Sequence, residues 1–505
     1  MVGLFGTLGT ATSGLNANQT ALQTAGHNIA NANTDGYSRQ RVGLQTQNPY
    51  HVAGVGAIGT GVKVANVQRI TDEFIAGQVR QSNSSYQAQE QKANTLGQLE
   101  SILNEPSSDG LMNALNVLND SWTKLANNPE LDTAKTLVVE NASSFLDILH
   151  NISKQTTQLR SDTTDSIEKS VLDFNEKLKQ LKDVNTEVFS LMQQGETPND
   201  LLDTRDSLLK DLSGLASIST SFDQFGRATV ELDGQTLLDS AHYKKIGVVV
   251  AQDENGNAMI SEDGNALAGN ITSSQKIPVG TLVIAPNNAT TYTEVKTSGG
   301  SIGGKQEAYT SIDERLSEVN QFTEMLARST NLIFTNGASE TDGFYKLDSN
   351  KQPVSQSLTV NETYAKNPTS MKVGKDNNSS IGDGSKALAI SQLATVKLGK
   401  PAELKAAFDS ATLSFQPASD GMTAAGFFNT VVTKNGIAKQ QADNGAKAQL
   451  SVLNQLEYKE QSISGVSMNE EMSDVIRFQQ GFQANARIIS VVSEMLDTLI
   501  NRTGV

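Results

Sequence analysis

The stretch MNEEMSDVIRFQQGFQANARIISVVSEML, residues 468–496, places an apolar side chain at every seventh position. A second run of the same period lies in the first thirty residues. A seven-residue apolar repeat predicts a helix whose apolar stripe must pack on another helix. The sequence therefore predicts terminal coiled-coil helices and, as their assembly contacts, Leu8, Leu15, Leu22, Ile29, Met468, Val475, Phe482, Ile489 and Leu496.

The partner of each terminal helix is left open by the repeat itself. It is either the opposite end of the same chain or the same ends of neighbouring copies. The positions between the repeats are often small or polar, as at Ala11, Asn18, Gln479 and Ser493. Such helices are weak alone, because packing supplies most of a helix's stability. The alternative is two ordinary amphipathic helices in one globular core.

Composition excludes several classes of protein. The 505 residues carry a net charge of -15, which argues against a general nucleic-acid binder. The chain has no cysteine, and its four histidines show no metal-binding spacing, so we expect neither a disulfide nor a metal or other cofactor. No apolar run reaches the roughly 18 residues of a membrane span, so we expect no membrane partner. The first residues lack the features of a secretory signal.

The periodicity changes along the chain. We expect a helix over 4–31, short strands near 42–46 and 62–64, and helices from about 72 to 214 with breaks at Pro106, Pro129 and 195–198. From about Ser217 the pattern becomes strand-like, with turns at Asp233-Gly234, Asn255-Gly256 and Asp263-Gly264. Helices return over 307–335, 385–398 and from 421 onward, around a polar, loop-rich segment at 336–384.

These segments predict an α+β, mainly α protein with three domains. Residues 1–85 and 445–505 would form a terminal coiled-coil domain, which the resemblance given below makes an inner tube. Residues 86–215 and 305–444 would form a bundle of long helices, which includes the loop-rich segment. Residues 216–304 would form one inserted all-β domain, which the same resemblance places on the outside.

Two glycine-rich stretches resemble phosphate-binding loops. Gly54-Val-Gly56-Ala-Ile-Gly59 matches G-x-G-x-x-G, but a strand rather than a helix is expected after it, so we interpret it as a turning loop. Gly299 to Lys305 has the G-x-x-x-x-G-K spacing, but Gln306 stands where Ser or Thr should bind magnesium. We interpret it as a flexible linker, with a phosphate-binding enzyme as the alternative.

Two charged patterns have structural interpretations. Asp203, Arg205 and Asp206 lie on one charged helix, where solvated salt bridges or interface contacts are the usual outcome. Ser467 and Glu470 have the spacing of a capping box that would start the last helix. We find no constellation of catalytic residues.

The ends of the chain resemble a known family. Residues 13–37, SGLNANQTALQTAGHNIANANTDGY, are similar to the N-terminal signature of flagellar rod, hook and hook-associated proteins, and SRQ at 38–40 is similar to its continuation. The C-terminal counterparts are RFQQGFQANAR at 477–487 and MLDTLIN at 495–501. The stretches TPNDLLDTRDSL at 197–208 and QSISGVSMNEE at 461–471 resemble the hook-associated branch.

The resemblance implies a non-enzymatic structural subunit, needed for filament assembly, that forms a ring at the junction of flagellar hook and filament. The implied partners are identical subunits, the hook protein, a second hook–filament junction protein and an export chaperone that covers the C-terminal helix. The implied location is extracellular, after export through the flagellar type III secretion system. The alternative within the class is a hook or rod subunit.

Overall fold

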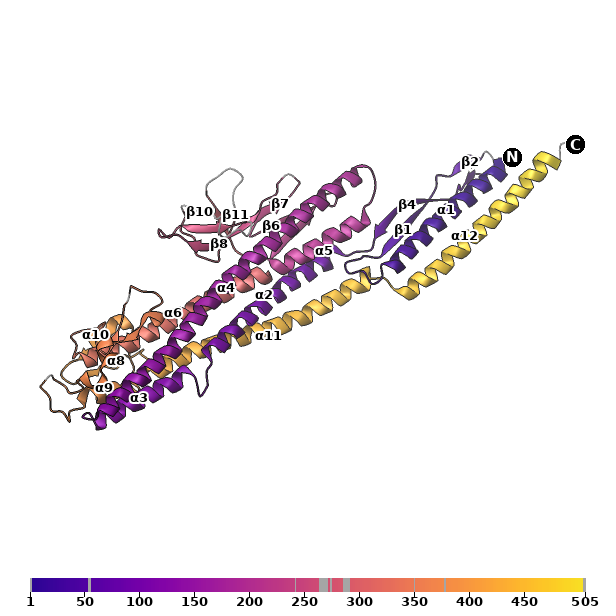
Figure 1. The fold of residues 1–505 in the computed structure, drawn as a ribbon. Helices are drawn as coiled ribbons and strands as arrows, with labels where there is room; N and C mark the ends of the chain where they lie inside the picture. Colours follow the sequence, from indigo (N-terminus) through magenta and orange to yellow (C-terminus); the bar gives the residue numbers. More distant parts are fainter. Residues whose placement is uncertain are drawn as a thin grey trace.

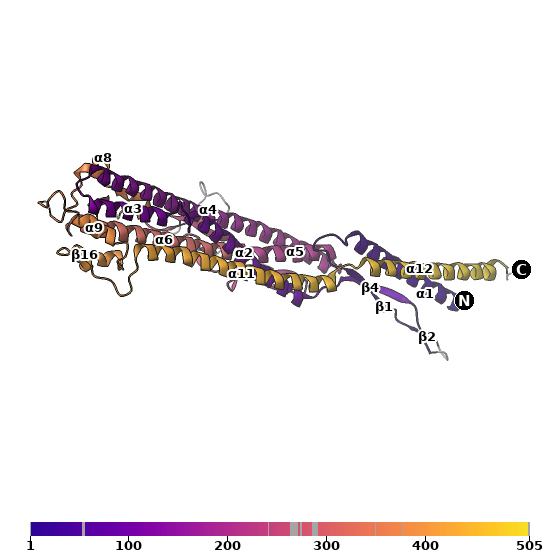
Figure 2. The ribbon, with the colours of Figure 1, turned by 90° about the horizontal axis from the view of Figure 1, so that it is seen from below.

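The computed structural model describes residues 2–52, 56–240, 242–262, 271–272, 275–284, 291–348, 350–376 and 378–502. Figure 1 shows an elongated molecule with both termini at one end. Helices α1 (Val2–Ala30) and α12 (Met468–Asp497) lie side by side there in a narrow extension, which Figure 2 shows from below. We call the described residues of 2–70 and 465–502 the terminal arm, and the helices beyond it the body.

A β-hairpin lies on the side of α1 away from α12 (Figure 1). Strand β1 (Gln40–Thr46) pairs antiparallel with β4 (Val62–Arg69), which confirms both predicted strands. Strands β2 (Tyr50–Val52) and β3 (Gly56–Ile58) extend the hairpin. Gly54 lies outside the described residues, but Gly56 and Gly59 bound β3, so this part of the G-x-G-x-x-G run belongs to a hairpin.

The body consists of long helices. They are α2 (Glu73–Leu103), α3 (Leu111–Asn127), α4 (Asp132–Gln193), α5 (Asn199–Leu215), α6 (Gly300–Phe334) and α11 (Ala424–Ser464). Helix α4 has 62 residues and is therefore about 93 Å long. The interruptions predicted near Pro106, Pro129 and 195–198 separate α2 from α3, α3 from α4 and α4 from α5.

The domain boundaries predicted from the sequence, after residues 85, 304 and 444, each lie inside one of these unbroken helices. Ile75 and Val79 near the start of α2 already pack with Leu453 of α11. Helix pairing therefore begins close to residue 72, and the arm joins the body at Ile70 and Gly465. Sequence periodicity does not mark this point, because α2 and α11 remain amphipathic through the proposed limits.

The end of the body farthest from the arm has an aromatic core. Trp122, Phe145, Phe322 and Phe428 are fully buried there. The segment 336–384 is rich in loops, as predicted, yet it contributes buried residues to this core. Its short elements and those that follow are β13 (Tyr345–Lys346), α7 (Val354–Ser357), β14 (Thr359–Val360), α8 (Glu362–Lys366), α9 (Ser385–Gln392), α10 (Leu404–Ala407), β15 (Phe408–Asp409) and β16 (Ser414–Phe415).

Two small sheets between α5 and α6 lie on one side of α4 (Figure 1). The first is β5 (Ile218–Phe222), β6 (Ala228–Leu232) and β7 (Gln235–Leu238). Asp233 and Gly234, at φ 51° and 71°, form the predicted turn between β6 and β7; Asp263-Gly264 lies outside the described residues. The second sheet, in the order β10-β9-β8-β11-β12, contains β8 (Ile246–Gln252), β9 (Ala258–Ser261), β10 (Ile271–Thr272), β11 (Leu282–Ile284) and β12 (Thr293–Val295).

Two buried asparagines of α4 fix these sheets to the helix. Asn175 donates to the carbonyl of Ile246 at 2.8 Å and accepts from the Ile246 N–H at 3.0 Å. Asn185 forms the same two bonds with Ala228, at 2.8 and 2.9 Å. Each side-chain amide therefore satisfies both backbone groups of one strand residue, which sets the position of each sheet along α4.

The start of α6 corrects the prediction of a flexible linker at Gly299 to Lys305. Gly300 begins α6, and Gly304 lies so close to α2 that an added Cβ would be 2.1 Å from the Ala88 carbonyl oxygen. Lys305 donates to Ser170 Oγ at 2.8 Å, and burial lowers its pKa. The glycines therefore allow α6 to pack closely on α2. Here they serve helix packing rather than the flexibility of a loop.

We expect Gly304→Ala to lower the free energy of unfolding by about 1–3 kcal/mol, because backbone must move to admit the methyl group. Gly436→Ala is the matched control: Gly436 lies within α11, and apart from its chain neighbours and the backbone of that helix no atom lies within 4 Å of an added Cβ. That change should raise stability by roughly 0.5–1 kcal/mol through helix propensity. Denaturant unfolding measures both, and equal signs for the two variants would contradict the packing explanation.

Candidate assembly site

The nine residues of the terminal repeats all lie on the arm. Within one chain none of them is buried: Met468 is exposed and the other eight are half-buried. They therefore retain apolar surface that another molecule could cover. Their role as contacts between copies remains a prediction.

Small residues make the closest approach between α1 and α12. An added Cβ on Gly14 would lie 2.9 Å from Asn485 Nδ2, and one on Gly481 would lie 2.7 Å from Asn18 Oδ1. The two helices are therefore antiparallel, with glycine facing asparagine twice. The buried residues of α1 follow the same face, at spacings of six, four, four and three: Ala11, Ala17, Ala21, Ala25 and Asn28.

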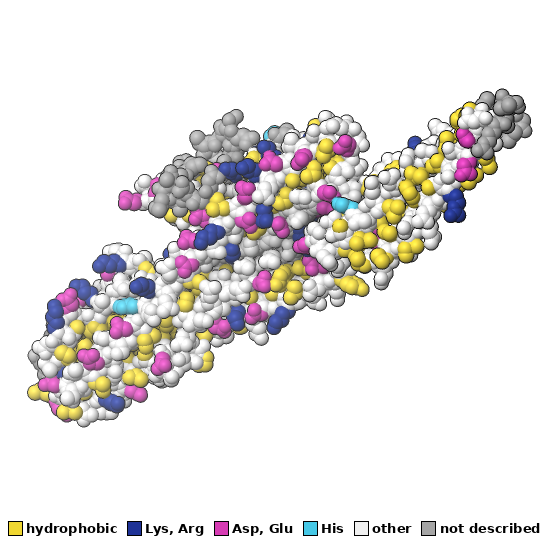
Figure 3. All heavy atoms as spheres, turned by 45° about the vertical axis from the view of Figure 1, so that its right-hand side comes forward, with side chains coloured by type: hydrophobic (Ala, Val, Ile, Leu, Met, Phe, Trp, Pro, Cys, Tyr) yellow, Lys and Arg dark blue, Asp and Glu magenta, His cyan; other side chains and the backbone are white. Residues whose placement is uncertain are grey.

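This seam leaves large apolar side chains uncovered along the arm, visible as a yellow band in Figure 3. Each terminal helix thus has a partner helix within its own chain, but that partner covers mainly small residues. The large apolar side chains that are exposed on α12 and the residues after it are Met468, Met472, Ile476, Ile488, Val491, Met495, Leu499 and Ile500. Exposed apolar surface of this extent is typical of an interaction site.

Arg39 connects the arm to the break between α11 and α12. Its Nε donates to Glu471 Oε1 at 2.7 Å and its Nη1 to Glu470 Oε2 at 2.8 Å. Its backbone N–H donates to the Ser464 carbonyl at 2.8 Å. Ser467 occupies the N-cap position of α12, but its side chain forms no capping bond, so the predicted capping box is absent. Glu470 serves the ion pair instead.

Asn28 of α1 forms hydrogen bonds with both Gln40 and Glu471, next to the Arg39 ion pairs. Its amide donates to the Gln40 carbonyl at 2.9 Å and to Glu471 Oε2 at 3.0 Å. Its Oδ1 accepts from the Gln40 N–H at 3.0 Å and from the Tyr37 hydroxyl at 2.8 Å. Burial, with the nearby carboxylates, raises the pKa of Tyr37, so its phenol stays protonated as a donor.

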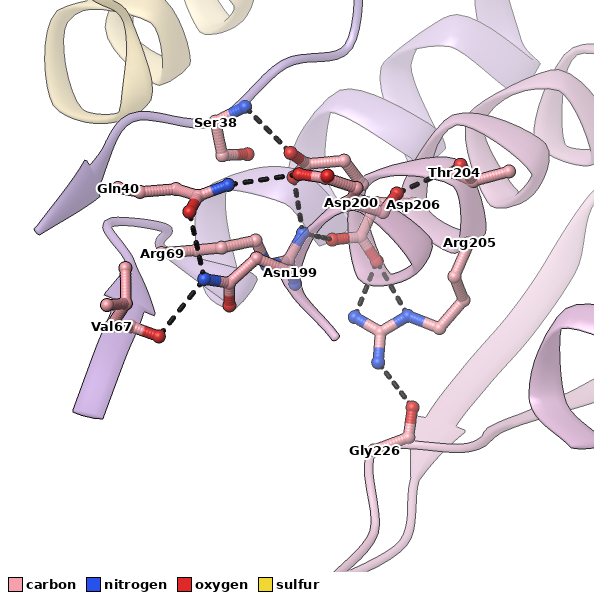
Figure 4. Close-up of polar contacts among 11 residues, drawn as sticks. Ser38, Gln40, Val67, Arg69, Asn199, Asp200, Thr204, Arg205, Asp206 and Gly226 are labelled. Atoms are coloured by element: carbon pink, nitrogen blue, oxygen red, sulfur yellow. Dashed lines mark hydrogen bonds and ion pairs between the residues drawn. The ribbon is translucent and has the colours of Figure 1, made fainter. Parts of the chain in front are cut away.

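Arg69 links β4 to the first turns of α5 (Figure 4). Its Nη1 donates to Asp203 Oδ1 at 2.7 Å and to Asp206 Oδ2 at 2.8 Å. Burial opposes the charge of Arg69, but the two carboxylates outweigh it and raise the pKa. Arg205 pairs with Asp206 on the other side at 2.6 Å and donates to the Gly226 carbonyl. The first of the two outcomes predicted for this helix, solvated salt bridges, is therefore wrong for Asp203 and Arg205, which are buried.

Neutral hydrogen bonds complete this contact (Figure 4). Gln40 donates to Asp200 Oδ1 at 3.1 Å, and Asn199 donates to Gln40 Oε1 at 3.1 Å and to the Val67 carbonyl at 3.0 Å. The Ser38 N–H donates to Asp203 Oδ2 at 3.2 Å. We call the polar residues Asn28, Ser38, Arg39, Gln40, Arg69, Asn199, Asp200, Asp203, Asp206, Glu470 and Glu471 the joint.

The joint gathers stretches that are far apart in sequence. Residues 38–40, 197–208 and 461–471, on which the resemblance to hook-associated proteins depended, all contribute to it. Periodicity did not indicate these residues as a site, because each stretch supplies only a few polar side chains. The available signal was the family resemblance, which had matched these three stretches.

The described residues show neither a metal-binding group nor a membrane span. They contain no group of three or more histidine, aspartate or glutamate side chains that could hold a metal ion. Among the described helices, none is long and apolar enough to cross a membrane. The features that stand out are a joint and an uncovered apolar arm.

Comparison with known families gives three matches in chain order. Residues 8–37 match the family described as flagella basal body rod protein. Residues 96–344 match the helical domain of the flagellar hook-associated protein FlgK, and residues 461–502 match the C-terminal region of flagellar basal body rod FlgEFG proteins. The first match lies in the arm, the last begins in the final turn of α11 and continues through the arm, and the second begins in α2 of the body.

Individual proteins align over nearly the whole chain. Flagellar hook-associated protein 1 of Bacillus subtilis is 28% identical over 528 residues, covering 100% of this chain and 99% of its own. The protein of the same name from Salmonella typhimurium is 25% identical, covering 97% and 98%. The flagellar hook junction protein FlgK from Burkholderia pseudomallei shares the fold, with a TM-score of 0.57 at 14% identity over 77% of this chain and 100% of that one.

An arm built from both termini and a long-helix body define the class: this is a structural, axial protein of the bacterial flagellum. Within that class, the match of the helical body and the full-length alignments are decisive. The chain belongs to the family of flagellar hook-associated protein 1.

Proposed function

We propose that copies of this chain form the junction ring between flagellar hook and filament and that the filament cannot assemble stably without it. The observation that carries the proposal is the arm, whose own helix pair leaves a band of large apolar side chains exposed. Burying that band between copies would stabilise an assembly by about 25 cal/mol for each Å² of apolar area.

The shape of the chain suggests how the layers are arranged. The arm would lie innermost, where its apolar surface is covered on several sides. The body would form the next shell, and the sheets beside α4 would face outward. We therefore propose 2–70 with 465–502 as the inner unit, the helical body as the middle unit and 218–295 as the outer unit. The joint would hold the first two at a defined angle.

The partners follow from a position between two different tubes. Identical subunits would lie beside each copy, the hook protein on one side and a second junction protein on the other. The chain would reach this extracellular place through the flagellar type III secretion system. We assign it no catalytic role, and no described feature favours phosphate binding at Gly299–Lys305, where Lys305 is bonded to Ser170.

Export requires that the exposed arm be shielded in the cytoplasm. We expect a small chaperone to bind α12 along Val475, Phe482 and Ile489, which are half-buried against α1 and become free if the arm opens. A chain truncated before Val466 should lose the chaperone in a pull-down from cytoplasm. Undiminished recovery with the truncated chain would place the chaperone site elsewhere.

Electron microscopy of cells lacking this protein tests the proposed position. We expect complete hooks without filaments, together with unassembled filament subunits in the medium. A hook or rod subunit predicts shortened or missing hooks instead. Normal filaments on the deletion strain would contradict both interpretations.

A further inference from the structure

We propose that the groove between α1 and β4 of one copy receives the exposed C-terminal half of α12 from a second copy of this chain. The inference rests on the proposed function, because it names the surface that would join neighbouring copies of the ring. Two observations lead to it: a groove that the chain's own helices leave open, and an apolar stripe on the same arm that its own helices leave uncovered.

The groove has a volume of about 610 Å³. Its lining includes Phe5, Leu8 and Thr12 of α1 and Val62, Lys63 and Val64 of β4. Phe5 is 54% exposed, so the rim is apolar and accessible. The groove is therefore ready to accept side chains rather than already filled.

The chain's own α12 cannot occupy the groove. The lining residues Phe5, Gly9, Thr12 and Asn16 follow one face of α1 at spacings of three and four. The residues that face α12, such as Gly14 and Asn18, lie two positions away from that face. Two positions correspond to about 200° around a helix. The groove and α12 are thus on opposite sides of α1, and Figure 1 shows β4 and α12 on opposite sides of that helix.

The apolar stripe on α12 matches the groove in length and in apolar character. Ile488, Val491, Met495 and Leu499 recur at spacings of three and four, so they share one face of the chain's last helical segment. All four are exposed, Met495 by 53%. They span about 17 Å along the helix, and the groove residues from Phe5 to Asn16 also span about 17 Å.

Charge supports the match and sets a register. Lys63 is the charged residue among those that line the groove, and its side chain is exposed. Glu494 is exposed and lies three positions after Val491, beside the stripe. Docking with Val491 next to Val64 would bring Lys63 and Glu494 together. Such a rim pair contributes more to register and partner choice than to affinity.

A contact between two different surfaces of the same chain has a geometric consequence. Each copy presents one groove and one stripe, so the contact is heterologous and leaves both copies with a free surface. Repetition of such a contact produces a closed ring or an open helix rather than a dimer. This is the type of interface that a junction ring of identical subunits needs.

Cysteine pairs test the contact in intact flagella, because the chain has no cysteine of its own. We expect the double variant Val64→Cys with Val491→Cys to give, on mild oxidation of isolated hook–filament material, a ladder at multiples of the chain mass. The matched control is Val64→Cys with Ser493→Cys, since Ser493 is exposed but lies on the opposite face of α12. It should give no ladder, and neither should either single variant alone.

The outcomes separate this inference from the proposed function. Equal ladders from test and control pairs, or products that do not match multiples of the chain mass, would overturn the groove-to-stripe contact. So would absence of a ladder when the variant is present at the hook–filament boundary. Absence of the unaltered chain from that boundary would overturn the proposed function itself.

Charge reversal supplies a second test that needs no disulfide. Lys63→Glu and Glu494→Lys should each lower the number of filament-bearing cells several-fold, because each places like charges together. The double reversal should restore most of that number. Thermal unfolding of the purified variants should be unchanged, since both side chains are exposed. A double variant no better than either single variant would contradict the pairing.

Discussion

Arg69→Met should lower the free energy of unfolding by about 3–5 kcal/mol, the usual cost of removing one partner from a buried ion pair. Arg69 is 8% exposed and holds Asp203 and Asp206 at 2.7 and 2.8 Å. Methionine keeps most of the volume but leaves the Asp203 carboxylate in the joint with the hydrogen bond from the Ser38 N–H, at 3.2 Å. The loss should appear as a lower midpoint in denaturant unfolding.

A surface pair provides the control. Lys366 and Glu362 form an ion pair at 2.9 Å with side chains 78% and 79% exposed. Lys366→Met should change stability by less than about 0.5 kcal/mol. Combining Arg69→Met with Asp203→Asn should cost less than the sum of the single changes, because the buried charge is removed with its partner. Strict additivity would mean that the two groups do not act as a pair.

Phe482→Glu should abolish the junction while leaving the body folded. Phe482 is half-buried on α12, on the part of the arm that we propose is covered in the ring. A carboxylate there loses apolar contact and enters a dry interface unpaired, which should cost several kcal/mol per copy. We expect filamentless hooks and flagellin in the medium, seen by microscopy and by analysis of the culture supernatant.

The neighbouring residue gives a matched control for charge. Gln483 is exposed, so Gln483→Glu adds the same carboxylate beside the seam rather than within it. Cells that carry this variant should remain motile. Motile cells with full-length filaments that carry Phe482→Glu as their single copy would defeat the proposed role of α12.

Much of the fold was predictable from patterns within single elements. The terminal helices, the strands at 42–46 and 62–64 and the breaks near Pro106 and Pro129 all follow from local periodicity and turn residues. The resemblance at the chain ends and at 197–208 predicted the family, which the comparisons confirm.

What the sequence did not reveal depends on contacts between distant segments. The sequence around Arg69 does not indicate its partners Asp203 and Asp206, because they lie more than 130 positions away. The glycines at 300–304 have the composition of a loop, and the backbone of Ala88 explains why they are in a helix instead. Likewise, Ser467 and Glu470 have the spacing of a capping box, but Glu470 accepts a hydrogen bond from Arg39 instead.

The position of one labelled residue along the intact flagellum tests the proposed function most directly. Lys351 is exposed, and in a chain without cysteine Lys351→Cys carries a unique site for a gold label. We expect a single narrow band of label at the boundary of hook and filament. Label distributed along the hook, the rod or the filament would contradict the assignment to the junction.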